Sequence, residues 1–236
     1  DIFYFSARDD AHGIEPWRSD GTIGGTQLIT DFNEHTSSIR AFSTPVNLDE
    51  KLLFSAYTPE VSLALYSSNG TEESTQMVKD ISSSDSLEDV DLLGASAEQA
   101  YYAIYDDEHG KELWCSDGTT NGTVFVKDIF PGEVSGVRNT PGIQFQNHFY
   151  FVAMESEDVG YELWKTDCTE EGTALVKDIY TGSNDSYPKY FIEFDNKIYF
   201  SARASGFGTE VWSSDGTEAG TGLLADIYTN TSSSNP

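Results

Sequence analysis

Short apolar stretches alternate with polar turns along the whole chain. The stretch 198–202 reads Ile-Tyr-Phe-Ser-Ala and is bounded on both sides by Asp, Asn, Gly and Ser. Runs of about five aromatic and β-branched residues between turn-forming residues are typical of β-strands, and no segment has the apolar spacing of a helix. Five copies of the stretch occur, at 2–7, 52–56, 100–104, 149–153 and 198–202. The pattern therefore predicts an all-β fold.

A second strand follows each of these stretches and carries an aromatic anchor. It reads Glu-Leu-Trp at 112–114 and is followed by a Ser-Asp-Gly-Thr turn at 116–119. The anchors, 48 to 50 residues apart, are Trp17, Tyr66, Trp114, Trp164 and Trp212. The matching turn residues are Asp20, Asn69, Asp117, Asp167 and Asp215. A repeat of this length is typical of solenoids, propellers and arrays.

Two further strands complete each repeat. An apolar stretch at 123–129 follows the turn, with copies at 26–32, 75–81, 173–179 and 221–227. A long linker rich in Ser, Gly, Asn and Pro leads to a stretch at 191–194, with copies near 39–42, 90–93 and 142–145. A tight connection then returns the chain to the next apolar stretch, as a β-hairpin would.

Four short strands repeated five times predict a five-bladed β-propeller built from units of about 49 residues. The units are approximately 1–32, 33–81, 82–129, 130–179 and 180–236, and together they form a single domain over 1–236. An open β-solenoid is the alternative. The propeller is favoured because the longest connection falls once per unit, where a propeller chain crosses from one blade's outer edge to the next blade's inner edge.

Closure of such a ring is a specific expectation. The chain contains five copies of three of its strand types but only four of the type at 191–194. We expect 2–7 to lie near 191–194 and close the ring. The missing strand has three explanations: a continuing chain, a three-stranded first blade, or a strand donated by another chain that would link subunits into a larger array.

The repeated residues have a structural and a functional interpretation. The anchor aromatics are expected to pack between neighbouring blades, and stacking on a sugar ring is the alternative. The turn Asp is expected to accept backbone N–H groups of its own turn, and cation binding is the alternative. Lys79, Lys127 and Lys177 share one position near the end of a strand, and we expect them to contact a neighbouring blade's carboxylate.

The two cysteines depart from the repeat in adjacent units. Cys115 follows one anchor directly, and Cys168 replaces the turn glycine after the next anchor. Two departures near one seam between blades predict a disulfide, with two free thiols as the alternative.

Charge excludes some partners. Forty Asp and Glu against thirteen Lys and Arg give a net charge of −27, so nucleic acid and anionic membranes are not expected partners. The excess of acidic residues could serve solubility or form a Ca²⁺-binding surface. The sequence identifies no metal ligands and no other cofactor. No apolar run is long enough to insert into a membrane.

Several features favour a secreted protein that is not an enzyme. The chain is acidic, lacks a leader, and contains glycosylation acceptor triplets at Asn69, Asn121, Asn184 and Asn230. No nucleophile motif or phosphate loop is present, and the four histidines lack metal-ligand spacing. With forty acidic residues, a chance pair of carboxylates says little about glycoside hydrolysis. Arg8 and Arg203 share a repeat position, which is a weak indication of an arginine cluster.

The lines Glu-Leu-Trp-x-x-Asp-Gly-Thr and Gly-Thr-x-Leu-Val-Lys-Asp-Ile resemble the ELWxxDGT repeat family, over nearly the whole chain. The resemblance implies a secreted protein with a propeller-like fold, and leaves the activity undefined. The sequence departs from the family pattern at Pro16, at Ala64, Tyr66 and Asn69 of the second copy, and at Cys168. We expect an extracellular binding, adhesion or structural module for protein or matrix partners. A glycan-binding lectin is the alternative, and a glycoside hydrolase is a third.

Overall fold

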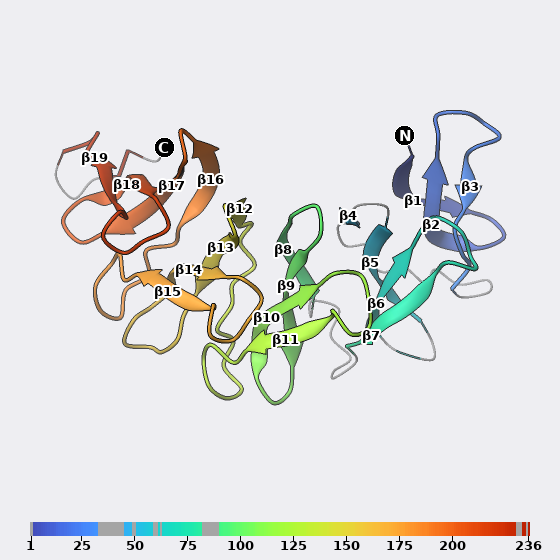
Figure 1. The fold of residues 1–236 in the computed structure, drawn as a ribbon, viewed down its shortest axis with the longest axis horizontal. Coiled ribbons are helices and arrows are strands. Elements are labelled where there is room, and N and C mark those ends of the chain that lie inside the picture. The colour runs from blue at the N-terminus through green and yellow to red at the C-terminus, as the bar shows by residue number, and fades with distance from the viewer. Residues whose placement is uncertain are drawn as a thin grey trace.

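The computed structural model describes residues 2–32, 45–48, 51–58, 61, 63–81, 90–229, 233–234 and 236. Over these residues the chain forms strands and turns and no helix, so no helix spans a membrane there. The described strands form one three-stranded and four four-stranded antiparallel sheets, which follow one another along the molecule (Figure 1). Each sheet corresponds to one sequence repeat.

Within every sheet the strands lie in chain order, joined by hairpins. The first sheet consists of β1 (Phe3–Asp9), β2 (Gly13–Ser19) and β3 (Gln27–Leu28). The second consists of β4 (Val46–Leu48), β5 (Lys51–Tyr57), β6 (Leu63–Ser68) and β7 (Gln76–Asp80). The third consists of β8 (Val90–Ala95), β9 (Ala100–Asp106), β10 (Gly110–Ser116) and β11 (Val124–Lys127). The fourth consists of β12 (Ile143–Phe145), β13 (His148–Ala153), β14 (Glu162–Thr166) and β15 (Ala174–Lys177). The fifth consists of β16 (Lys189–Phe194), β17 (Lys197–Ala204), β18 (Gly208–Ser214) and β19 (Gly222–Ala225).

A β-bulge recurs beside the anchor aromatic. In the third sheet the pairing shifts between Leu113 and Trp114, so that Val126 of β11 is left between two paired residues. The same shift occurs before Tyr66, Trp164 and Trp212. A bulge bends the strand and increases its twist. The repeated bulge therefore gives successive sheets the same local shape.

The core lies between sheets, in four seams. We call the face of a sheet that meets the next unit its forward face, and the opposite face its rear face. In the seam between the third and fourth units, Ala103, Leu113 and Val126 of the forward face pack with Phe151 and Trp164 of the rear face. Equivalent clusters fill the other three seams. The anchor aromatic belongs to the rear face in each case.

A disulfide crosses one of these seams. Cys115 on the forward face of the third unit is bonded to Cys168 in the turn of the fourth unit, with their Cα atoms 6.0 Å apart. Cys168 has a φ of 68°, in the region where the equivalent Gly118 and Gly216 also lie. The cysteine thus accepts a left-handed backbone conformation that the repeat normally gives to glycine.

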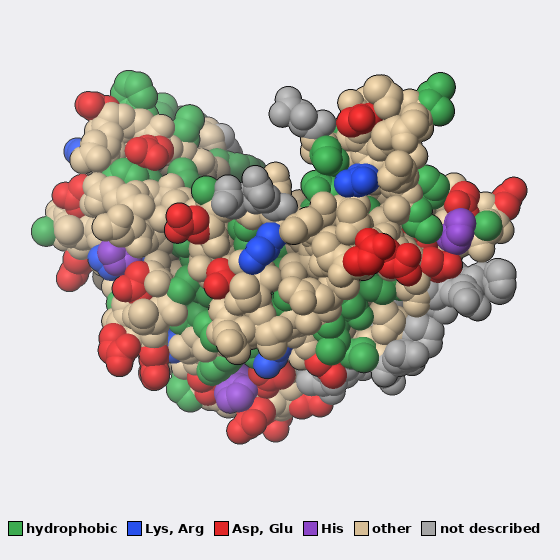
Figure 2. Space-filling view, turned by 45° about the vertical axis from the view of Figure 1, so that its right-hand side comes forward, with side chains coloured by type: hydrophobic (Ala, Val, Ile, Leu, Met, Phe, Trp, Pro, Cys, Tyr) green, Lys and Arg blue, Asp and Glu red, His purple; other side chains and the backbone are tan. Residues whose placement is uncertain are grey.

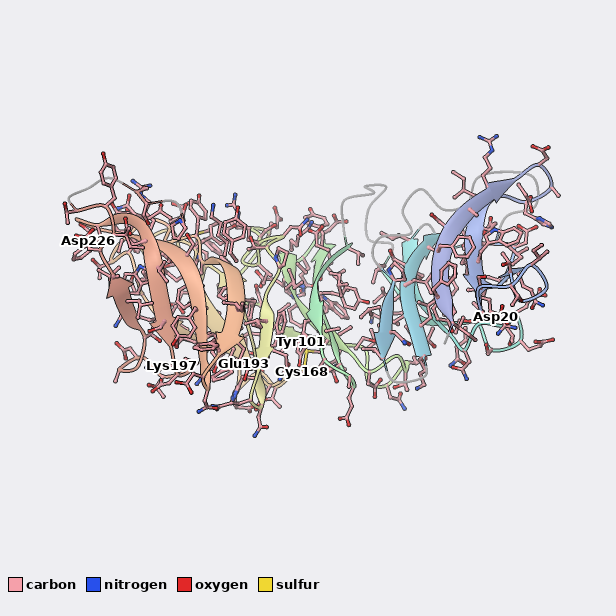
Figure 3. The ribbon with its side chains drawn as sticks, turned by 90° about the horizontal axis from the view of Figure 1, so that it is seen from above. Asp20, Tyr101, Cys168, Glu193, Lys197 and Asp226 are labelled. Atoms are coloured by element: carbon pink, nitrogen blue, oxygen red, sulfur yellow. A yellow bond between two sulfur atoms is a disulfide. The ribbon has the colours of Figure 1, made fainter. Side chains whose placement is uncertain are left out.

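The expected closed ring is not formed. The five sheets fan out in an open arc, and β1 and β16 lie at its opposite ends (Figure 1). Viewed from above, Asp20 and Asp226 mark the two ends and Cys168 lies near the middle (Figure 3). The side chains that fill each seam fix the angle between its two sheets. The angles at the four seams together add up to less than a full turn. The expectation that 2–7 would lie beside 191–194 is therefore wrong.

The remaining sequence ranges differ from the structure in detail. The first sheet has three strands, one of the outcomes that the strand count allowed. The stretch 39–42, expected to open the second unit, lies outside the described residues. The strand that pairs with β5 is β4, farther along the chain.

We expect removal of the disulfide, in a Cys115→Ser/Cys168→Ser variant, to lower the free energy of unfolding by roughly 4 kcal/mol, because the bond closes a long loop of the unfolded chain. The cysteines are 53 residues apart in sequence. Urea unfolding of both proteins measures the difference. Titration of two free thiols in the denatured, unreduced protein would contradict the structure.

Candidate functional site

The anchor aromatics lie inside the seams. Tyr66, Trp114, Trp164 and Trp212 are buried, and Trp17 in the first unit is half-buried. The Nζ atoms of Lys79 and Lys127 lie 5.0 Å and 6.0 Å from the ring centroids of Trp114 and Trp164, respectively. In these seams the indole rings are occupied by the preceding unit, which leaves no face for a sugar.

The repeated lysines reach across the seam to backbone atoms. Lys127 Nζ donates to the carbonyl oxygen of Thr173 at 2.9 Å, and Lys177 Nζ donates to that of Thr221 at 2.8 Å. The expectation of a carboxylate partner is therefore wrong. A single ammonium group links two sheets here through a carbonyl and, for Lys127, an indole ring.

The turn aspartates are engaged within their own turns. Asp117 Oδ1 accepts the backbone N–H of Thr119 at 2.8 Å and its hydroxyl at 2.7 Å. The hydroxyl of Thr119 in turn accepts the N–H of Gly122 at 3.0 Å. A Cβ atom at Gly122 would lie 2.0 Å from Asp117 Oδ1, so the carboxylate fits only against glycine. The turns at Asp20, Asp167 and Asp215 have the same bonds.

The second unit forms the same turn with different residues. Asn69 replaces the aspartate, and Ser74 replaces the glycine five residues later. The hydroxyl oxygen of Ser74 accepts the backbone N–H of Thr71 at 3.2 Å and its hydroxyl at 3.0 Å. It therefore takes the place of the missing carboxylate oxygen, and the two substitutions compensate each other.

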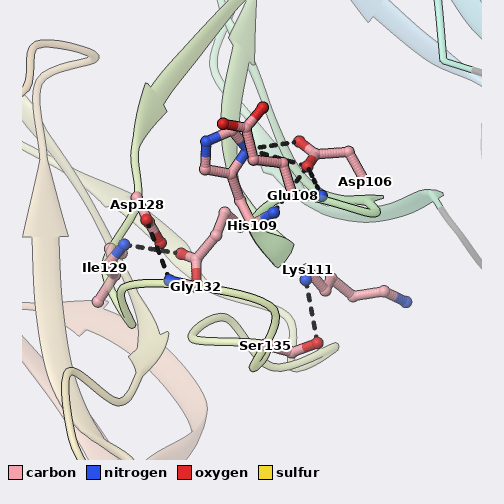
Figure 4. A network of polar contacts seen from close by, with 9 residues as sticks. Asp106, Glu108, His109, Lys111, Asp128, Ile129, Gly132 and Ser135 are labelled. Atoms are coloured by element: carbon pink, nitrogen blue, oxygen red, sulfur yellow. Dashed lines mark hydrogen bonds and ion pairs between the residues drawn. The ribbon is translucent and has the colours of Figure 1, made fainter. Parts of the chain in front are cut away.

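The glutamate before each Leu-Trp pair organises the crossover between units. Glu112 is fully buried, and its carboxylate accepts the backbone N–H of Ile129 at 3.0 Å, Phe130 at 3.3 Å and Gly136 at 2.7 Å. Nearby, Gly132 donates to Asp128 and the backbone N–H of Lys111 donates to Ser135 (Figure 4). Glu162 makes the equivalent bonds to Ile179, Tyr180 and Ser186.

These glutamates have unusual titration behaviour. Burial raises the pKa of Glu112 and of Glu162 to about 7, against the opposing effect of the hydrogen bonds that each accepts. The neighbouring carboxylates of Asp128 and Asp178 also raise the two pKa values. At the end of the arc, hydrogen bonds from Ser234 and the backbone hold the pKa of Glu210 below its usual range. Glu210 is nevertheless as little exposed as Glu112 and Glu162, although no following unit lies against its sheet.

A polar groove lies between the first and second units. It has a volume of about 460 Å³ and is lined by both charges, including His12, Arg18, Asp31, Glu72 and Glu73. His12 is held by Asp9, whose Oδ2 lies 2.8 Å from Nδ1, and this contact raises the pKa of His12. The groove can take up a small polar molecule, and the described contacts do not arrange a nucleophile beside a general base in it.

Sequence reasoning missed two arrangements. The rings of Tyr161 and Tyr187 stack with their centroids 6.4 Å apart, and the guanidinium of Arg138 lies beside the pair, 5.2 Å and 4.7 Å from the two centroids. His109 is held by Asp106 just as His12 is held by Asp9. The recurrence of Asp-x-x-His at one repeat position signals the second arrangement. The contact of Arg138 with the two tyrosines lies outside the repeat and has no such signal.

The other predicted residues are spread over the molecule. Arg8 and Arg203 lie in the first and last units, at opposite ends of the arc. Asn69, Asn121 and Asn184 are exposed, and Asn230 lies outside the described residues. Among the described residues, no group of three or more His, Cys, Asp or Glu side chains could hold a metal ion. Acidic side chains are scattered over the face seen in Figure 2.

The comparisons with known proteins show a fold. No family model and no curated protein matches the sequence. The chain is similar to oligopeptidase B from Leishmania major, with a TM-score of 0.58 and 14% identity over 94% of this chain and 31% of that one. It is also similar to a puromycin-hydrolyzing peptidase from Mycobacterium tuberculosis, with a TM-score of 0.54 and 10% identity over 96% of this chain and 37% of that one. For TolB from Acinetobacter baumannii the TM-score is 0.51, with 13% identity over 95% of this chain and 52% of that one.

These likenesses show a β-propeller-like fold and nothing further, because the identities are low. The chain spans between 31% and 52% of the length of the three structures. The propeller-like arrangement of repeated sheets agrees with the prediction from sequence. The five sheets form an open arc, so the predicted number of five blades in a closed ring stays a prediction.

We expect Gly220→Ala to destabilise the chain by about 1–3 kcal/mol, because its Cβ would displace the Asp215 carboxylate from its hydrogen bonds. The Cβ would lie 2.0 Å from Asp215 Oδ1. Gly222→Ala is the matched control, since nothing lies within 4 Å of its Cβ position. Urea unfolding compares the two. Equal stability of the two variants would contradict the role assigned to the turn.

The buried glutamates predict a pH dependence of stability. Their folded pKa of about 7 exceeds the unfolded value of about 4.5, so the folded chain binds more protons between these values. Their contribution to stability is complete below the unfolded pKa and is lost as the pH rises through 7. The free energy of unfolding should fall by up to about 1.4 kcal/mol per pH unit for each group in this window.

Glu162→Gln removes one of these groups. We expect the variant to be less stable by about 1–3 kcal/mol at pH 5, because an amide cannot accept as many backbone N–H bonds. Its stability should also vary less with pH between 5 and 8. Glu193→Gln, at an exposed position, is the control and should keep the slope of the parent. An unchanged slope in Glu162→Gln would show that Glu162 titrates normally.

Proposed function

We propose that this chain is an extracellular, non-catalytic binding module that acts through protein–protein contacts, as an adhesion or structural element. The observation that carries the proposal is an apolar surface on the last unit. Its members are exposed, and they are Tyr190, Ile192, Phe194, Leu224, Ile227 and Tyr228. So many large exposed apolar side chains on one unit are unusual on a monomeric soluble protein, and such surfaces mark interaction sites.

The repeated polar residues support a role without catalysis. The turn aspartates, the buried glutamates and the strand lysines are all engaged in holding the chain or its seams together. Residues used in this way in most of the repeats serve the fold. Partners would accordingly be extracellular proteins or matrix, with nucleic acid and membrane insertion disfavoured by the charge of −27.

Secretion is supported by the disulfide, because such bonds persist in oxidising compartments. The exposed acceptor residues Asn69, Asn121 and Asn184 are compatible with glycosylation there. Ca²⁺ binding stays a proposal that rests on the acidic surface alone.

Glycan binding is the second candidate. The exposed rings of Tyr190 and Phe194 offer flat apolar faces on which a sugar could stack. A glycoside hydrolase is less favoured, since forty acidic residues make chance pairs of carboxylates inevitable and a pair alone is no evidence for it.

We expect the chain to bind at least one protein on a panel of purified extracellular-matrix proteins, and Phe194→Ser to weaken that binding at least about tenfold. Val134→Ser, also at an exposed apolar position but in another unit, is the control and should bind as the parent does. The parent chain and both variants are also applied to a glycan array and tested on a panel of fluorogenic glycosides.

Binding to glycans alone would favour the lectin, and turnover of a glycoside would contradict the non-catalytic assignment. If Phe194→Ser binds matrix proteins as the parent does, the binding surface does not lie on the last unit.

A further inference from the structure

One contact recurs at equivalent positions in three of the four seams; in the second–third seam a Cβ atom at the turn position Gly118 would instead meet Lys51 and Leu48. The residue directly after the anchor, on the forward face, meets the turn glycine position of the next unit. In the third–fourth seam this contact is the Cys115–Cys168 disulfide. In the fourth–fifth seam Lys165 Nζ donates to the carbonyl oxygen of Gly216 at 3.0 Å. In the first–second seam, a Cβ atom at Gly70 would lie 3.1 Å from the side chain of Arg18.

The two ends of the arc each carry one unmatched half of this contact. Ser213 follows the last anchor and has no next unit in the arc. Gly21 occupies the turn position of the first unit, and nothing lies within 4 Å of its Cβ position. The two unmatched halves belong to opposite faces, forward in the last unit and rear in the first.

The forward face of the last unit exposes positions that are buried elsewhere. Leu224 is 55% exposed, whereas its equivalents are at most 7% exposed. Those equivalents are Ile29, Val78, Val126 and Val176. Ile227 is 61% exposed, whereas Ile81, Ile129 and Ile179 are at most 6% exposed. This face therefore has the composition of a seam without a neighbour.

The rear face of the first unit is uncovered in the same way. Phe3 is 56% exposed, whereas its equivalents are at most 1% exposed. Those equivalents are Leu52, Ala100, Phe149 and Ile198. The ring of Phe3 stacks on that of Phe5, with centroids 5.3 Å apart. The first unit thus presents an aromatic pair where other units present a packed seam.

A notch on the forward face suits this aromatic pair. It has a volume of about 140 Å³ and is lined mainly by apolar side chains, among them Ile192, Tyr199 and Val211. In the fourth–fifth seam the equivalents of Tyr199 and Val211, which are Tyr150 and Leu163, pack in one cluster with Phe200. Phe5 occupies the repeat position of Phe200, so its ring is of the kind that this notch would receive.

We propose that the forward face of the last unit binds the rear face of the first unit of a second copy of this chain, head to tail. The occupant is a second copy because the two uncovered faces are the two halves of a seam that the chain already builds four times. Such a contact joins different surfaces, so it either closes a ring or extends into a filament. The proposal deepens the binding function above and rests on the same apolar surface.

Charge sets the conditions of assembly. Each copy carries a net charge of −27, so two copies repel each other at low salt. Salt at about 0.5 M screens charges beyond a few ångströms and leaves the apolar contact in place. Association should therefore strengthen as the salt concentration rises, the reverse of an association held by ion pairs.

The test builds the recurring disulfide across the proposed contact. In the double variant Gly21→Cys/Ser213→Cys, the new cysteines stand at the positions of Cys168 and Cys115. Under mild oxidation at about 0.5 M salt, we expect most of the chain to become covalent dimers or longer species on a non-reducing gel, and reduction to restore the monomer. Mixing the two single variants should give heterodimers that grow no further.

Two controls separate this contact from random collision. In Gly132→Cys/Ser213→Cys, one cysteine stands at an equally open glycine of positive φ that lies outside the seam position. This variant should cross-link at least about tenfold more slowly, since the cysteine at position 132 is not held beside the cysteine at position 213 of the other copy. Adding Leu224→Asp to the Gly21→Cys/Ser213→Cys variant should abolish cross-linking, because it places a charge in the contact without burying it in the monomer.

Equal cross-linking of the Gly21 and Gly132 variants, or a monomer at all salt concentrations by light scattering, would overturn the proposal. Matrix binding that is lost in Phe194→Ser while the chain stays monomeric would leave the binding function in place and remove only the second copy as its partner.

Discussion

The packing of one sheet's forward face against the next sheet's rear face is the interaction on which the structure depends. A single four-stranded sheet with two apolar faces cannot bury either face alone, so every unit requires a neighbour. The second, third and fourth units have one on each side, and the cluster between the third and fourth units is buried throughout. The aromatic anchor, the bulge beside it and the strand lysine all act at this seam, and their recurrence explains why the repeat is so regular.

Two polar side-chain arrangements hold the units in the shape that the seam requires, although the second unit has Ala64 in place of the glutamate. The turn carboxylate fixes the hairpin between the third and fourth strands of a unit, and the buried glutamate fixes the crossover to the next unit. Both use side-chain oxygens to satisfy backbone N–H groups that the strands leave unpaired. The second unit shows that the bonds matter more than the residue types, since Ser74 accepts the bonds that an aspartate accepts in the other units.

The sequence predicts the parts of this structure that repeat. Strand order, the anchor positions and the turn with its aspartate all follow from the alignment of five copies, because identical contacts require similar residues. Closure could not be predicted, because it depends on the angle at each seam and on how many seams there are. The partner of Lys127 was also predicted wrongly, since charge suggests a carboxylate where the fold offers a carbonyl and a ring. The contact of Arg138 with Tyr161 and Tyr187 occurs once, so the repeat pattern does not predict it.

Hydrogen exchange of the monomeric chain at low salt tests the central claim most directly. If seams supply the stability, the strands flanked by sheets on both faces, β9 and β13, should exchange most slowly. Backbone amides of β1, β2 and β19, at the uncovered ends of the arc, should exchange fastest among the strands. Equal protection of β1 and β9 would contradict the account, because it would mean that the first unit is covered by a neighbour or does not need one.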